Sequence, residues 1–130
     1  MVDMEYLYLH KSKIKGNVSS IANLNKLKHL YLFGLKVKWN ISNFADIREI
    51  KRLYLQETLI EGDIETISNL NHIKRLYLYN TNIYGDISSL SNMSKAEYIK
   101  VQRTKVSGDK SSLDSLLKLK ELNILQTEVK

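Results

Sequence analysis

The chain has 130 residues, of which 43% are hydrophobic and 26% charged, as expected of a single globular domain. Its formal net charge of +6 favours acidic partners, and the absence of cysteine excludes disulfides and thiolate metal sites. No apolar run approaches the roughly 20 residues of a membrane span, and the first ten residues lack the basic and apolar regions of a signal peptide. We therefore expect no membrane insertion, and these features leave the compartment open.

The first predicted element is a short strand that recurs every 23 residues through the whole chain. Its alternation of period two points two aliphatic residues to one face and the residue between them to the other. The first aliphatic column is Leu7, Leu30, Leu53, Leu76, Ile99 and Leu122, and the second is Leu9, Leu32, Leu55, Leu78, Val101 and Ile124. A fixed period of this size indicates a solenoid, because stacked coils can bury aligned aliphatic columns that one coil cannot bury alone.

A bend and an irregular return follow each strand. Glycine and then a capping residue recur at Gly16-Asn17, Gly62-Asp63, Gly85-Asp86 and Gly108-Asp109. This pair predicts a positive φ followed by a side-chain hydrogen bond to the backbone. The next apolar residues are spaced by three, as Ile67 and Leu70 are, which predicts a single turn of 3₁₀-helix rather than another strand.

The resulting pattern, L-x-x-L-x-L-x-x-T-x-I-x-G-D-I-x-x-L-x-x-L-x-x, resembles the leucine-rich repeat family over essentially the whole chain. Its I-x-G-D-I segment is similar to the return of the plant-type subclass, without the proline. The resemblance implies an α/β-type right-handed solenoid with a concave parallel β-sheet and an irregular or 3₁₀ convex side. We expect residues 1–130 to form one solenoid, with five full repeats starting near residues 4, 27, 50, 73 and 96 and a truncated sixth from residue 119.

Two departures from the family pattern carry expectations of their own. Threonine stands at positions 58, 81, 104 and 127, where the family usually has asparagine, and its single hydroxyl donor predicts a thinner hydrogen-bond ladder. Uncapped terminal coils would expose aliphatic rows and strand edges, so we expect a fragment or a chain that stacks on something.

The position between the two aliphatic residues predicts a tyrosine ladder on the solvent face of the concave sheet. With neighbouring outward residues, the candidate partner-binding set is Tyr6, Tyr8, Tyr31, Phe33, Arg52, Tyr54, Arg75, Tyr77, Tyr79, Tyr98, Lys100 and Arg103. Tyrosine and arginine are typical of binding hot spots. Basic residues outnumber acidic ones on this face, so we interpret the chain as a non-enzymatic module that binds a protein or peptide, first of all an acidic segment.

Other interpretations of the ladder stay open. Cross-strand aromatic pairs contribute roughly 0.2–1 kcal/mol each, so the tyrosines could serve sheet stability alone. A structural role, with chains stacking through their terminal coils, and a surface adhesin that stacks glycans on tyrosine are the alternatives. Single-stranded nucleic acid is disfavoured, because the basic residues are spread around the coil rather than gathered in one stripe.

No pattern indicates catalysis, a cofactor or a metal. The aspartate column Asp63, Asp86 and Asp109 could hold calcium, but capping of the turns explains it better. His10, His29 and His72 occupy three different repeat positions, and no phosphate loop or nucleophile motif is present.

The repeat is broken in two units. Trp39 replaces the glycine in the second unit, where it predicts either a partner patch or a side chain that fills the bend. In the fifth, Ala96 and Lys110 replace core aliphatics and Leu117 takes an outward position, which predicts looser C-terminal coils with Lys110 reaching water.

Overall fold

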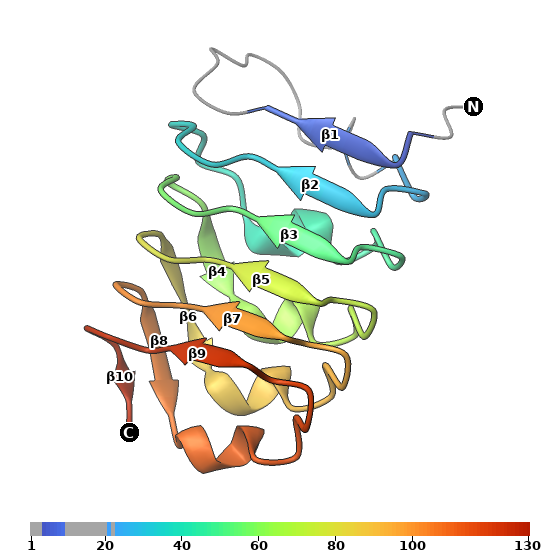
Figure 1. Cartoon of the computed structure of the whole chain (residues 1–130). Helices are drawn as coiled ribbons and strands as arrows, with labels where there is room; N and C mark the ends of the chain where they lie inside the picture. Colours follow the sequence, from blue (N-terminus) through green and yellow to red (C-terminus); the bar gives the residue numbers. More distant parts are fainter. Residues whose placement is uncertain (1–3, 10–20, 22) are drawn as a thin grey trace.

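The computed structural model describes residues 4–9, 21 and 23–130. The chain forms successive coils stacked on one another, and the strands of these coils make two sheets of parallel strands (Figure 1). The bend predicted at Gly16 and Asn17, and the side chain of His10, lie outside the described residues.

The six-stranded front sheet consists of β1 (Tyr6–Tyr8), β2 (His29–Tyr31), β3 (Arg52–Tyr54), β5 (Arg75–Tyr77), β7 (Tyr98–Lys100) and β9 (Glu121–Asn123). All pairs are parallel, and the register joins Leu30 to Leu53 and Leu53 to Leu76, which repeats the 23-residue spacing of the sequence. These three leucines are fully buried. The residue between the core columns therefore faces outward on every front strand.

A second parallel sheet, the back sheet, corrects the prediction of an irregular return. Its strands are β4 (Glu61–Asp63), β6 (Asn82–Asp86), β8 (Lys105–Gly108) and β10 (Glu128–Val129), in the order β10-β8-β6-β4. The prediction missed it because it relied on side-chain patterns. Coils of equal length bring their extended returns within backbone hydrogen-bonding distance, and buried backbone groups then pair with one another whatever the side chains are. One such bond runs from the Asn82 amide to the Ile60 carbonyl, at 3.0 Å.

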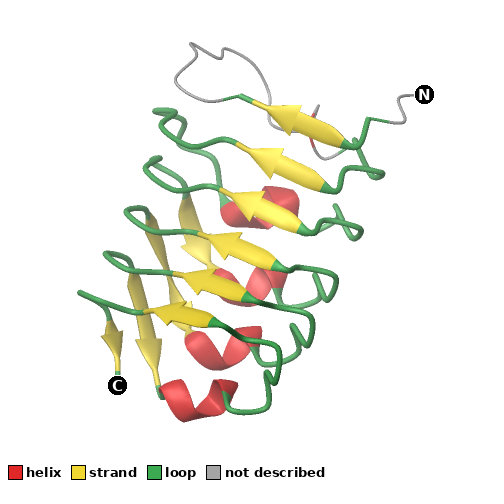
Figure 2. Ribbon diagram, in the orientation of Figure 1, coloured by secondary structure: helices red, strands yellow, loops and turns green. Residues whose placement is uncertain are grey.

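The predicted 3₁₀ turns follow the back strands: η1 (Ile41–Phe44), η2 (Ile64–Ile67), η3 (Ile87–Leu90) and η4 (Lys110–Leu113). Figure 2 shows them stacked one per coil. The last three are N-capped by the expected aspartates, whose side chains accept from the backbone amide two residues later, for example Ser88 N to Asp86 Oδ1 at 2.9 Å, and η1 is capped in the same way by Asn40, which was not predicted. Turn capping is thus the structural role of the aspartate column.

Gly62, Gly85 and Gly108 have the predicted positive φ, but they lie within or at the end of back strands rather than in a separate bend. Gly85 has φ +116°, and a Cβ built on it would collide with Oδ1 of Asp63 in the preceding coil. Gly62 stands in the same relation to Asn40. Glycine at this position therefore serves both the backbone conformation and the close approach of the cap from the coil before it.

The threonines keep their hydrogen bonds inside one coil. Thr81 Oγ1 donates to the Leu78 carbonyl at 2.7 Å and accepts from the Ile83 amide at 3.4 Å, and Thr58 and Thr104 repeat the arrangement. All three are buried, with 5–7% exposure. None of these bonds links one coil to the next, which agrees with the thinner ladder expected from a single hydroxyl.

The breaks in the repeat are accommodated locally. Trp39 packs half-buried against the core, with its ring centroid 6.4 Å from that of Phe44, so it fills the space beside the bend. Ala96 is fully buried, Lys110 is exposed and Leu117 is 91% exposed, as their repeat positions predicted. Among the described residues, no helix combines the length and hydropathy needed to cross a bilayer.

Candidate functional site

The tyrosine ladder runs across four neighbouring front strands. Ring centroids are 5.1 Å apart between Tyr8 and Tyr31, 4.6 Å between Tyr31 and Tyr54, and 4.2 Å between Tyr54 and Tyr77. The last pair is stacked, with 11° between ring planes. Tyr8 is 57% exposed and the other three are half-buried by one another. The ladder therefore presents ring edges and hydroxyls in a fixed order.

Further aromatic rings widen this surface on both sides of the ladder. The ring of Tyr6 lies 4.5 Å from that of His29, and Phe33 meets Tyr8 edge-on at 5.6 Å. Tyr79 lies 6.3 Å from Tyr77. These contacts restrict each side chain, so little conformational freedom is left to lose on binding.

The cations of the front sheet lie against the rings. Arg75 Cζ lies 4.9 Å above the ring of Tyr98, and Lys100 Nζ lies 4.8 Å from the ring centroid of Tyr77. Cation–π contacts of this kind hold a charge in place while leaving part of it open to a ligand. Lys100 Nζ is also 3.9 Å from Glu121 Oε2. Arg52 lies in register with Arg75 on the neighbouring strand, so two arginines project from adjacent rungs of the sheet.

The protonation states of the residues on this surface favour an anionic ligand. A hydrogen bond with Tyr54 raises the pKa of Arg75, so its charge is permanent. Burial raises the pKa of Tyr77 and of Tyr79, which keeps their hydroxyls as donors at neutral pH. Burial, followed by the charge of Arg52, lowers the pKa of His29. The surface thus offers cations and hydroxyl donors together, a combination that suits carboxylate or phosphate oxygens.

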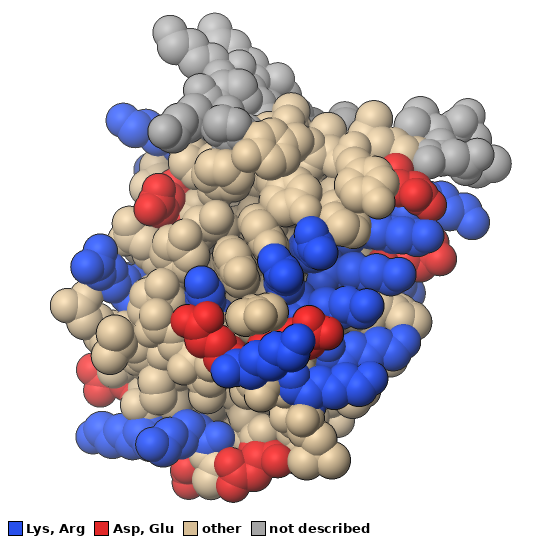
Figure 3. All heavy atoms as spheres, in the orientation of Figure 1, with Lys and Arg blue, Asp and Glu red and all other residues tan. Residues whose placement is uncertain are grey.

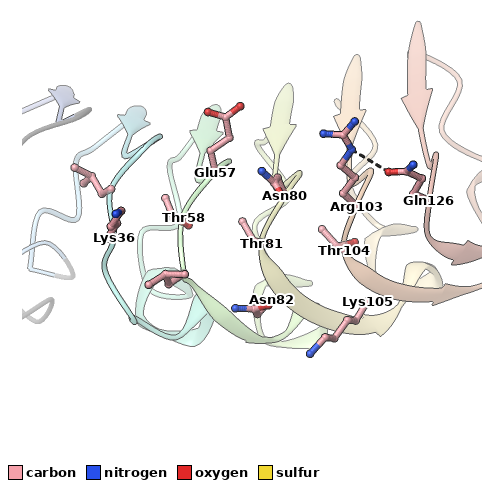
Figure 4. A pocket seen from close by; sticks show the side chains of 12 residues that line it. Lys36, Glu57, Thr58, Asn80, Thr81, Asn82, Arg103, Thr104, Lys105 and Gln126 are labelled. Carbon is pink, nitrogen blue, oxygen red and sulfur yellow. Dashed lines mark hydrogen bonds between the residues drawn. The ribbon is translucent and has the colours of Figure 1, made fainter.

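A groove of about 660 Å³ lies beside the front sheet, where the chain turns away from it (Figure 4). Its rim includes Glu57, Asn80, Arg103 and Gln126, all with left-handed φ of 55–57°. Arg103 Nε donates to Gln126 Oε1 at 2.9 Å, so Arg103 belongs to this rim and not to the sheet. Buried threonines such as Thr81 lie deeper.

Sequence reasoning missed several groove residues, among them Leu59, Asn82, Lys105 and Gln126. One signal was present, because Gly34 occupies the repeat position of Glu57 and also has a positive φ, of 77°. The other coils place non-glycine residues there, which hides the left-handed turn from a composition-based analysis.

No protein-family model and no curated protein sequence matches this chain, whereas solved structures match nearly all of it. A plant peptide hormone receptor, RGFR1 in complex with RGF2, has a TM-score of 0.85 and 24% identity over 96% of this chain. The internalin InlF of Listeria monocytogenes has a TM-score of 0.84 and 28% identity over 98%, and an LRR protein of Leptospira interrogans has 0.80 and 21% over 97%. The chain has the leucine-rich-repeat fold. It spans 21%, 36% and 32% of the lengths of those three proteins.

Within the leucine-rich-repeat fold, the front sheet is the predicted concave parallel sheet of the right-handed coil. The predicted residues that the structure brings together on this sheet and its edge are Tyr6, Tyr8, Tyr31, Phe33, Arg52, Tyr54, Arg75, Tyr77, Tyr79, Tyr98 and Lys100. Arg103 stands apart, at the groove. We call the assembled set the tyrosine–cation surface.

A second basic region, the lysine ridge, lies in the turns that lead into the front strands. It comprises Lys26, Lys28, Lys51, Lys74, Lys95, Lys118 and Lys120. Figure 3 shows Lys and Arg side chains gathered along the edge where these strands begin. The expectation that basic residues are spread around the coil is therefore wrong for this edge. The lysines occupy two repeat positions that lie two residues apart in the same turn. Stacking of the coils aligns both positions along one edge of the front sheet.

The histidines do not form a metal site in the described part of the chain. His72 Nδ1 lies 3.3 Å from Lys95 Nζ, whereas His29 Nδ1 lies 3.1 Å from the Tyr31 hydroxyl. Among residues 4–9, 21 and 23–130, no three histidine, cysteine, aspartate or glutamate side chains are placed to hold a metal ion.

Proposed function

We propose that the tyrosine–cation surface binds an extended acidic segment of another protein. The observation that carries this proposal is the in-register ladder from Tyr8 to Tyr77, closed at one end by Lys100 over the last ring. Rigid aromatic rings offer contact area at a low entropic cost, and the cations beside them favour carboxylates.

The choice of an acidic partner follows from the charges that remain available. Arg52 and Arg75 lie in register on β3 and β5, and no carboxylate among the described residues forms an ion pair with either one. Glu121, the acidic residue of the front strand β9, lies 3.9 Å from Lys100 Nζ. An incoming carboxylate would therefore meet two uncompensated guanidinium groups.

Similar solved structures support a role in protein recognition. The plant receptor with a TM-score of 0.85 is described as a peptide hormone receptor in complex with RGF2. Because the shared property at this identity is the fold, the similarity supports a protein or peptide ligand in general, and the acidic character comes from the residues of this chain.

The test is selection from a displayed library of random peptides, followed by affinity measurement of the selected peptides on the intact chain. The double variant Tyr54→Ala/Tyr77→Ala should lose binding by at least about tenfold per tyrosine, the effect of removing a hot-spot residue. Tyr84→Ala is the matched control, since Tyr84 is 47% exposed on the back strand β6. Undiminished binding by the double variant, or selected peptides without an acidic bias, would contradict the proposal.

A structural role is the second candidate, favoured by the open edges of both sheets at β9 and β10. Leu125, which follows β9, is 70% exposed, and unpaired strand edges can pair with another chain. Light scattering over a concentration series checks this candidate. A strict monomer at the highest concentration would exclude it.

A further inference from the structure

We propose that the lysine ridge is a second binding site, for a linear anionic polysaccharide. The ridge lies in the turns before the front strands, and the tyrosine–cation surface lies on the strands themselves. The inference is thus independent of the function proposed for that surface.

Positive charge outweighs negative charge along the ridge. Its seven lysines are accompanied in the same turns by Glu5, Glu49 and Glu97, and by Asp46 and Arg48, which lie 3.9 Å from each other. Lys28 pairs with Glu5 at 3.0 Å and Lys120 with Glu97 at 3.8 Å. For the remaining five lysines, the described residues supply no ion pair. The ridge therefore keeps a concentrated positive charge that an external anion can neutralise.

The ridge is long and narrow. Adjacent coils lie about 4.8 Å apart, so five coils give a line on the order of 20 Å long. In its middle, a hollow of about 270 Å³ is lined by Lys51, His72, Lys74, Lys95, Glu97 and Lys118. Such a narrow line fits a single flexible chain better than a duplex or a flat surface.

Neutral polar side chains stand beside the lysines. Asn25, Asn71 and Ser94 are exposed at one shared repeat position next to the lysine columns. Amide and hydroxyl groups can bond sugar hydroxyls while ammonium groups meet sulfate or carboxylate. Lysine is a point charge with three rotatable donors, so it tolerates anions at irregular positions along a chain.

Other polyanions lack part of what they require. The turns at residues 46–51, 69–74, 92–97 and 115–120 contain no phenylalanine, tyrosine or tryptophan on which the bases of a single-stranded nucleic acid would stack, and the one imidazole there, of His72, lies 3.3 Å from Lys95 Nζ. Binding at a membrane surface needs basic residues together with an apolar face. Leu117, exposed near one end of the ridge, is a single side chain and does not make such a face. Sugar chains require neither feature.

The experiment measures binding of the intact chain to heparin, used as the sulfated probe, at several salt concentrations. The variant Lys51→Gln/Lys74→Gln/Lys95→Gln removes the centre of the ridge. The control Lys38→Gln/Lys105→Gln/Lys110→Gln removes the same charge from exposed positions outside the ridge. We expect about tenfold weaker binding and a shallower salt dependence for the ridge variant, and less than about threefold weakening for the control, since each exposed ion pair contributes roughly 0.2–1 kcal/mol.

Three results would overturn the proposal: equal weakening by the two triple variants, absence of heparin binding at low salt, or tighter binding of oligo-dT, duplex DNA or phosphatidylserine vesicles than of heparin. Circular dichroism confirms that both variants fold. The double variant Tyr54→Ala/Tyr77→Ala should bind heparin normally, so failure at one surface is distinguishable from failure at the other.

Discussion

Front strands pair residues 23 apart and back strands pair residues 21 apart, and the two sheets also differ in how their side chains vary along the stack. Outward positions of the front sheet vary along the stack, with Tyr77, Lys100 and Asn123 on successive strands. In the back sheet, Gly62, Gly85 and Gly108 recur because each makes room for the cap of the preceding coil. The front sheet can therefore change its surface at low cost, whereas the back sheet fixes how the coils stack.

Gly85→Ala should break the back sheet most strongly. The backbone strain alone costs about 1–3 kcal/mol at φ +116°, and displacing the Asp63 cap adds about 1 kcal/mol. Denaturant unfolding measures the loss. Since the two effects share one contact, the double variant Asp63→Ala/Gly85→Ala should cost less than the sum of the single variants. Simple additivity would show that the cap and the glycine are not coupled.

Thr81→Val should be next in size. It leaves the Leu78 carbonyl and the Ile83 amide without their side-chain partner in a buried site, which lowers the free energy of unfolding by about 1–3 kcal/mol. Thr66→Val is the control, because Thr66 is exposed and bonds only the Asp63 carbonyl among the described residues. Thermal unfolding of the two variants side by side checks the difference, and equal losses would refute it.

Tyr54→Leu tests how much the tyrosine ladder of the front sheet contributes to stability. Its two ring contacts, with Tyr31 and Tyr77, are replaced by aliphatic packing, so the free energy of unfolding should fall by about 1 kcal/mol or less. The same change should weaken the selected peptide by about tenfold. Loss of stability as large as that of Gly85→Ala would mean that the ladder is primarily structural.

The smallest effect is a pH dependence at His29, also on the front sheet. Burial and the charges of Arg52 and Lys51 lower its pKa below 6.5, against the opposing charge of Glu5. The unfolded chain therefore binds more protons than the folded chain as pH falls through 6.5, and stability decreases in that window. His29→Gln should remove this part of the decrease. Identical pH profiles of the two proteins would contradict the assignment.

Sequence was sufficient where a side chain carries the information. The aliphatic columns, the tyrosine positions, the caps and the positive φ of Gly85 all follow from residue type and spacing. The back sheet could not be predicted, because its short strands pair through backbone groups and Gly-Asp shows no alternation. The lysine ridge was missed for another reason: Lys51 and Lys95 occupy different repeat positions, and only the stacked turns place them on one edge.

The spacing of the tyrosine ladder restricts which residues of a bound peptide can contact the rings. Its rungs repeat at about 4.8 Å, whereas an extended chain presents side chains on one face every 6.7 Å or so. The two spacings do not match over one or two rungs. Over three rungs they nearly match, because three strand spacings measure about 14 Å and two same-face spacings of the peptide measure about 13 Å. A segment running along the solenoid would therefore seat its residues i and i+4 on Tyr8 and Tyr77, and tolerate many substitutions between them.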